Sequence, residues 1–211
     1  YPDFIHLVDK FSFERNYNKD LPARMTALEK IDFKDADIFF FDALGVEYLS
    51  FILAKSKELD LFVDVTICRA NLPTITEMNK DFMSLFEDIP SIKLLDEVKH
   101  SDEGDFNYNR TKLPIHICRE LEIIEQFLNK VRTKLNEKEK VIVISDHGAS
   151  RLAIIHEGSK SVDLGSKGMH GGRCCVYIEG IKKIDEAVEE NGYYVIGNYN
   201  KIKGGRINSV E

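Results

Sequence analysis

Four short apolar runs, separated by segments of helical periodicity, constrain the fold of this chain more than any other feature. The runs cover residues 37–42, 61–67, 141–145 and 174–178. They are rich in β-branched and aromatic side chains, which favours strands. Because the runs are apolar almost without interruption, we expect strands that are covered on both faces, as in a parallel sheet.

Between these runs, apolar residues recur at the spacing of helices. One expected helix has an apolar face that extends from Leu44 to Leu53. Another is expected to carry Ile181, Ile184 and Val188 and to end near Gly192. The longest pattern spans about five turns and consists of Ile117, Leu121, Ile124, Leu128, Val131 and Leu135. Alternating strands and helices predict an α/β fold with a central, mostly parallel sheet and helices on both faces. Residues 193–200 and 203–208 predict a terminal hairpin or an edge strand.

The length and charge of the chain limit its domain organisation and its partners. Its 211 residues predict a single domain over residues 1–211, large enough to bury a core without disulfides. Because the first residue is Tyr1 and not Met, we expect this domain to be part of a longer protein. A net charge of −7 argues against coating of nucleic acid by this part alone, so such binding is expected only with the full-length chain.

Cysteine usage and hydropathy predict where the protein resides. The four cysteines contain no C-x-x-C pair, which favours reduced thiols and a cytoplasmic location. No apolar run approaches the ~20 residues of a membrane span, and no signal peptide is recognisable, so no membrane partner is expected.

Polar residues follow two of the predicted strands at the point where each strand ends. Asp42 follows the first run, and Asp146 and His147 follow the third. Active sites of open α/β sheets form at the carboxyl ends of strands, so we expect these side chains to converge. Carboxylate oxygen together with imidazole nitrogen suits a zinc site. For Asp42 the alternative is an N-cap of the helix that begins at Ala43 and Leu44.

Thr76 lies beyond the second run and is the candidate nucleophile. Thr74 and Glu77 fit a capping box, which would place Thr76 in the first helical turn, at the positive end of the helix dipole. Such a position favours phosphate binding, and metal coordination activates a hydroxyl for attack. Asn79, one turn later, is a candidate donor to a phosphate oxygen, with an ordinary surface role as the alternative.

Further candidates lie in the last third of the chain. Glycines on both sides of His170 predict a tight backbone that holds a second metal ligand, with a surface loop as the alternative. Arg151, Lys167 and Arg173 lie near the candidate ligands in sequence and are candidates for phosphate contact. An ordinary surface charge is the alternative for each of these three residues.

The chain order of Asp42, Thr76, Asp146-His147 and His170 resembles that of the alkaline phosphatase superfamily. Within it, the chain is similar to the PglZ domain of bacterial phage-defence (BREX) systems. The resemblance spans roughly residues 37–180 and rests on the segments 41–48 (FDALGVEY), 72–76 (LPTIT), 144–148 (ISDHG) and 169–172 (MHGG). The last two segments are the more specific ones.

This resemblance implies two divalent metal ions, with zinc expected and manganese or magnesium as alternatives. One site would use Asp42, Thr76, Asp146 and His147. The other would combine His170 with an acid and a histidine that precede the long helix. Relatives often carry an Asp four residues before this histidine, whereas here Lys112 precedes His116. We therefore expect His116, with Asp105 or Asp102 as the carboxylate, and His100 as the weaker alternative histidine.

The activity implied by the resemblance is hydrolysis of phosphate monoesters or diesters in phage defence. Thr76 would attack phosphorus, and water would release the phospho-threonine intermediate. The expected partners are a phosphate-ester substrate and other proteins of the same defence system. The main alternative is a catalytically weak or inactive scaffold domain. A phosphomutase is disfavoured, because residues 83–110 are too short for a large substrate-recognition domain.

Overall fold

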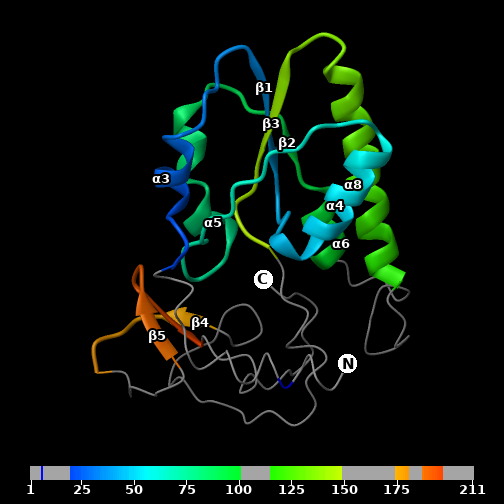
Figure 1. Ribbon diagram of the computed structural model, residues 1–211. Helices are drawn as coiled ribbons and strands as arrows, with labels where there is room; N and C mark the ends of the chain where they lie inside the picture. Colours follow the sequence, from blue (N-terminus) through cyan, green and yellow to red (C-terminus); the bar gives the residue numbers. More distant parts are fainter. Residues whose placement is uncertain (1–5, 7–19, 101–114, 149–173, 181–186, 197–211) are drawn as a thin grey trace.

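The computed structural model describes residues 6, 20–100, 115–148, 174–180 and 187–196, and its arrangement is drawn in Figure 1. Within these residues the elements run in the order α3 (Arg24–Leu28), β1 (Ala36–Phe41), η1 (Val46–Tyr48), α4 (Leu49–Glu58), α5 (Thr76–Asn79), η2 (Asp81–Leu85), β2 (Ser91–Ile92), α6 (Leu94–His100), α8 (Ile115–Lys134), β3 (Lys140–Ile144), β4 (Cys174–Val176), β5 (Ala187–Glu190) and β6 (Tyr193–Ile196). The predicted mixed α/β class is confirmed. No helix in this part of the chain is long and apolar enough to cross a membrane.

Three parallel strands form the sheet at the centre of the structure, in the order β2-β1-β3. The register pairs Ala36 with Lys140 and Phe40 with Ile144, while Phe41 pairs with Ile92. The strands expected at residues 37–42 and 141–145 are therefore confirmed, and both lie in this sheet. All three strands end on the same side, which brings the residues that follow them together.

Helices cover both faces of this sheet, because side chains of β1 alternate between two apolar clusters. Phe39 and Phe41 pack with residues of α6 and α8, such as Leu95 and Ile124, in one cluster. Phe40 packs on the opposite side with residues such as Phe82. Figure 1 accordingly shows α3 and α5 on one side of the strands and α4, α6 and α8 on the other.

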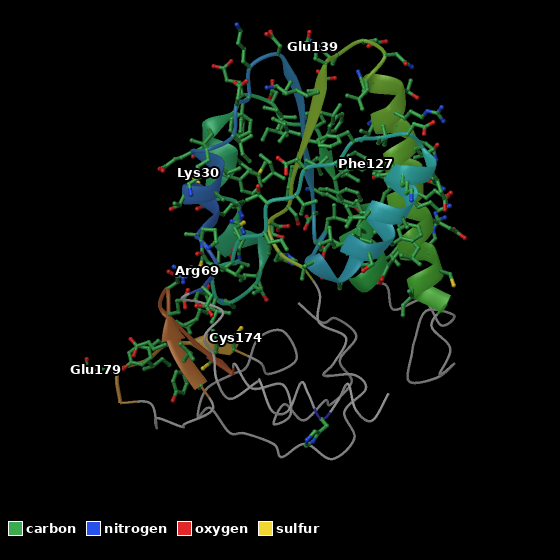
Figure 2. All side chains as sticks on the ribbon, viewed as in Figure 1. Lys30, Arg69, Phe127, Glu139, Cys174 and Glu179 are labelled. Carbon is green, nitrogen blue, oxygen red and sulfur yellow. The ribbon has the colours of Figure 1, made fainter. Side chains whose placement is uncertain are left out.

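The long helix α8 forms because its apolar residues recur every three or four positions and face the sheet. The helix was expected from this spacing, and its bounds agree with the expectation to within a few residues. Phe127 packs edge-on against Phe39 and Phe41, with ring centroids 5.6 and 4.9 Å apart. Figure 2 shows this ring in the layer between sheet and helix. Replacing it with alanine would cost about 3–5 kcal/mol.

The strand expected at residues 61–67 is not formed, and this prediction was wrong. The segment has no regular secondary structure, and beyond it Arg69 makes a bridge with Ala23. Phe62 is 97 % exposed. The run has the composition of a strand, but it pairs with none of the three strands of the parallel sheet.

The described residues after position 173 form a separate antiparallel sheet, in the order β4-β6-β5. The run at residues 174–178 does form a strand, β4, but not in the parallel sheet as expected. The helix expected over residues 181–188 is also wrong where it can be compared, because Val188 lies in β5. Asn191 and Gly192 have positive φ angles of 52° and 79° and form the turn of the β5–β6 hairpin. Residues 193–196 thus form a strand, but β6 pairs with β5 and β4 as the central strand and is not the expected edge strand, while residues 197–208 of the expected hairpin lie outside the described residues.

Candidate metal centre

Asp42 extends the central strand by one residue into the end of the sheet. Its N–H donates to the carbonyl of Ile92 (3.0 Å), and the residue is 5 % exposed. Ala43 then adopts a positive φ of 56°, which turns the chain and directs its N–H to Asp146 Oδ1 (3.0 Å). The first helical turn begins later, with Gly45 as its N-cap. The alternative role of Asp42 as a helix cap is therefore excluded.

Asp146 and His147 follow β3 and are 2 % and 4 % exposed. Asp146 Oδ1 accepts the hydrogen bond from Ala43, whereas Oδ2 accepts none from any residue that the structure describes. His147 Nδ1 lies 3.0 Å from the carbonyl oxygen of Gly148, which can only accept, so Nδ1 carries a hydrogen. In the neutral ring, His147 Nε2 is then the atom with the free lone pair.

His147 Nε2 faces the carboxylates of both neighbouring acids. It lies 3.3 Å from Asp146 Oδ2 and 3.9 Å from Asp42 Oδ1. Three acceptor atoms this close repel one another unless a proton or a cation lies among them. Asp146 Oδ2 in particular accepts no hydrogen bond within the described residues, and a buried acceptor without a donor is expected of a metal ligand before the metal binds.

Asp96, in the first turn of α6, belongs to the same cluster and was not predicted from the sequence. Ligand atoms of Asp42, Asp96 and His147 all lie within 4.8 Å of one another. The residue enters the site because β2 ends at Ile92, beside the end of β1, and α6 begins two residues later. The apolar spacing of Leu94, Leu95 and Val98 indicates the helix that carries Asp96. The sequence does not reveal that this helix begins at the end of the sheet, because β2 is too short to be recognised as a strand.

Thr76 is the first residue of α5, and its side chain points at the acids. Its hydroxyl donates to Asp42 Oδ1 at 3.3 Å, and Oγ1 lies 3.3 Å from His147 Nε2. Thr76, Asp42, Asp146 and His147 therefore converge, although they come from widely separated parts of the sequence. Their predicted roles as metal ligands and nucleophile stay predictions.

The capping box predicted for this helix is wrong. Ile75, not Thr74, occupies the N-cap position, and no side chain caps the helix. The helix starts one residue later than expected, because the N–H of Ile75 donates to the carbonyl of Pro73 (2.8 Å) in a tight turn. With four residues, α5 offers little of the helix dipole that a phosphate seat requires.

Asn79 has a structural role, so the prediction that it contacts phosphate was wrong. The residue is fully buried. Its Nδ2 donates to the carbonyl oxygens of Asn71, Pro73 and Ile75, at 2.9–3.3 Å. Its Oδ1 accepts from the Asn71 N–H (2.7 Å) and from Arg24 (3.0 Å). The amide group thus closes the loop that precedes Thr76 and has no donor left for a substrate.

Burial, followed by the neighbouring charges of Asp146 and Asp96, raises the pKa of Asp42 from its ordinary value of 3.8 to about 6. His147 and the hydrogen bond from Thr76 act in the opposite direction and are outweighed. A carboxyl that is costly to ionise in the metal-free protein is stabilised as an anion by a nearby cation.

Two glycines allow the segments after β1 and β3 to approach each other. A Cβ placed on Gly45 would lie 2.4 Å from the Cα of Gly148, and a Cβ on Gly148 would lie 2.7 Å from the Cα of Gly45. This close backbone contact requires glycine at both positions, and it supports the segment that carries Asp146 and His147.

The remaining predicted site residues cannot be placed at this centre. His116 and His100 lie in α8 and α6, but their side chains are outside the described residues. The other predicted ligands and phosphate contacts also lie outside the described residues, namely Asp102, Asp105, Arg151, Lys167, His170 and Arg173. The second metal site therefore stays a prediction.

Comparison with protein-family models, curated proteins and solved structures finds no match to this chain. The functional assignment consequently rests on the geometry of the centre and on the residues themselves.

Proposed function

We propose that this chain is a metal-dependent hydrolase of phosphate esters with Thr76 as its nucleophile. The observation that carries the proposal is the convergence of acceptor side chains and one hydroxyl at the carboxyl end of the parallel sheet. Asp42, Asp96 and His147 lie within 4.8 Å of one another, and the Thr76 hydroxyl lies 3.3 Å from Asp42 and from His147.

The residues present fit a divalent cation. Asp42, Asp96 and His147 Nε2 would hold it, and Asp146 Oδ2, which accepts no hydrogen bond within the described residues, offers a further oxygen. Several oxygens with one imidazole suit zinc, our expected metal, and also manganese or magnesium. When bound, the cation would neutralise the buried acids and polarise a phosphoryl oxygen.

Thr76 supplies the attacking oxygen in this proposal. Its hydrogen bond to Asp42 Oδ1 orients the hydroxyl and gives the proton an acceptor as the oxygen attacks phosphorus. The alcohol leaves in line, opposite the attacking oxygen, and takes its proton from solvent. Water then hydrolyses the phospho-threonine, which releases phosphate from a monoester substrate or a phosphate monoester from a diester. The Thr76 hydroxyl is regenerated, and Asp42 gives up its proton to solvent.

The resemblance to the alkaline phosphatase superfamily and to PglZ domains supports the same reaction. It adds expectations that lie outside the described residues: a second metal ion at His170 with His116 and Asp105, and phosphate contacts from Arg151, Lys167 and Arg173. As in the sequence-based expectation, the proposed setting is the bacterial cytoplasm, with other phage-defence proteins as partners.

Metal analysis combined with hydrolysis of generic substrates tests the proposed function. We expect the purified protein to bind zinc or manganese and to hydrolyse p-nitrophenyl phosphate or bis(p-nitrophenyl) phosphate. Thr76→Ala should bind metal without turnover, while Asp146→Asn should weaken both metal binding and turnover. If wild-type protein retains no zinc, manganese or magnesium and neither substrate is hydrolysed, the scaffold alternative replaces the enzyme.

A further inference from the structure

Arg24, the first residue of α3, is a buried cation that contacts the backbone of Asp146 at the candidate centre. The residue is 5 % exposed, although a guanidinium is costly to bury unless its donors are paired. Its ion pair with Asp81 (3.0 Å) provides the countercharge, and its guanidinium carbon lies 5.4 Å from the centre of the Phe82 ring. This cost requires an explanation, because a single ion pair that reaches the surface rarely stabilises a fold by much.

The guanidinium joins α3 to two parts of the chain that are far apart in sequence, residues 79–81 and Asp146. Nη1 donates to the carbonyl of Asn79 (2.7 Å) and to Asp81 Oδ1 (3.0 Å). Nη2 donates to Asn79 Oδ1 (3.0 Å) and to the carbonyl oxygen of Asp146. One planar group thus connects the end of α5, the start of η2 and the segment that follows β3.

These contacts are made to the two segments that carry the nucleophile and the candidate ligands. Asn79 is the last residue of the four-residue helix that begins with Thr76. The carbonyl of Asp146 lies in the peptide bond to His147. Arg24 therefore contacts both segments, and none of its hydrogen bonds goes to a candidate ligand atom.

We propose that Arg24 is a positioning residue, which sets the distance between the Thr76 hydroxyl and the Asp146-His147 pair. This inference rests on the proposed function. Lysine cannot replace arginine in this role, because a single ammonium group cannot reproduce a planar fork that bridges four acceptors. A displacement of about 1 Å at the nucleophile costs about a hundredfold in rate.

The first experiment compares Arg24→Lys with Arg119→Lys, a matched control on the exposed face of α8. Both variants should fold and bind zinc or manganese with the stoichiometry of wild type. We expect kcat of Arg24→Lys on bis(p-nitrophenyl) phosphate to fall by about 10- to 100-fold, with KM changed by less than about threefold. A purely structural role would instead lower the amount of folded protein and leave kcat per folded molecule unchanged.

A crystal structure of metal-free Arg24→Lys provides a readout that needs no activity. The distance between Thr76 Oγ1 and His147 Nε2, 3.3 Å in the wild type, should increase by about 1 Å. An unchanged distance overturns the positioning role. If Thr76→Ala abolishes activity while Arg24→Lys keeps wild-type kcat, the positioning role fails and the proposed function stands. If wild type has no activity at all, the proposed function fails and the distance alone decides the role of Arg24.

Asp81→Asn provides a milder variant in case Arg24→Lys does not fold. It keeps an oxygen acceptor for Arg24 Nη1 but removes the countercharge on the exposed side. We expect kcat to fall by about three- to tenfold with an unchanged KM. Wild-type kcat together with an unchanged Thr76–His147 distance in this variant would also overturn the positioning role.

Discussion

The two ends of the three-stranded sheet differ in how their charged residues are paired and buried. At the amino end, exposed Asp32 pairs with Lys140 at 2.8 Å, and this hydrogen bond lowers the pKa of Asp32. At the carboxyl end, Asp42 and Asp146 are buried beside each other and beside Asp96, and the pKa of Asp42 is raised to about 6. Arg24, a buried cation close to this end, donates to the backbone carbonyl of Asp146 rather than to its carboxylate.

The exposed ion pair at the amino end is typical of a solvated surface, whereas the buried acids at the carboxyl end are typical of a functional site. Exposed pairs form wherever opposite charges meet, and they contribute little. Buried acids that face one another oppose folding, so they persist where they serve binding or catalysis. A divalent cation bound at the carboxyl end of the sheet would stabilise the buried carboxylates of Asp42 and Asp146.

The largest expected effect is that of Thr76→Ala on turnover. Removing the nucleophilic oxygen should lower kcat by about 10³-fold or more, while metal binding changes little. Steady-state hydrolysis and calorimetric metal titration measure the two properties separately. Thr133→Ala is the matched control, because the Thr133 hydroxyl is exposed on α8. Equal activity in the two variants would rule out Thr76 as the nucleophile.

Asp96→Asn tests the ligand that the sequence did not reveal. We expect metal affinity to fall by about 10- to 100-fold, because a neutral amide oxygen is a weaker ligand than a carboxylate. Glu97→Gln, at the next and exposed position of α6, should bind metal like wild type. If both variants bind equally well, Asp96 is not a ligand.

The detection of Asp96 illustrates what sequence patterns can reveal and what they cannot. Asp42, Asp146 and His147 were predictable because each follows an apolar run at the end of a strand. Asp96 was not, because β2 consists of two residues and acquires its place from pairing with β1. Hydrophobic patterns record burial, whereas pairing depends on which strand edges are free.

The same limit explains the errors elsewhere in the chain. Leu61–Ile67 has the composition of a strand but finds no place in the parallel sheet. Residues 187–190 fitted a helical pattern, yet the Asn191-Gly192 turn selects a hairpin. Asn79 was assigned to substrate because the sequence cannot show how many backbone carbonyls its amide would meet.

Acidic pH should weaken metal binding through Asp42. A ligand with a pKa of about 6 is mostly protonated at pH 5, so apparent affinity should fall by about tenfold between pH 7 and pH 5 from this residue alone. Metal titrations at the two pH values measure the change. Affinity that is independent of pH over this range would contradict a role for Asp42 as a ligand.

The same raised pKa predicts how stability varies in the metal-free protein. Between pH 3.8, the ordinary pKa, and about pH 6, Asp42 keeps its proton in the folded state but has lost it in the unfolded state. The contribution of Asp42 to stability is therefore greatest at low pH and is lost as the pH rises through this window. Asp42→Asn should remove the dependence and, at pH 7, stabilise the metal-free protein by about 0.5–2 kcal/mol.

Asp37→Asn, near the amino end of β1, is the variant to compare with Asp42→Asn, and we expect it to have the smallest effect on stability. Asp37 faces Lys134 at 3.7 Å in a partly exposed pair, so its replacement should leave the unfolding midpoint almost unchanged. Denaturant unfolding of both variants measures the difference between the two ends. Equal effects of Asp37→Asn and Asp42→Asn would mean that the carboxyl end bears no particular electrostatic cost.

The most direct test of the central claim is a crystal of the protein soaked in manganese or zinc and measured at the absorption edge of the metal. The account predicts an anomalous peak at coordination distance from Asp42, Asp96 and His147 Nε2, close to the Thr76 hydroxyl. The peak should disappear in crystals of Asp42→Asn combined with His147→Ala. A wild-type crystal with no peak at these residues, at metal concentrations that saturate ordinary sites, would contradict the account.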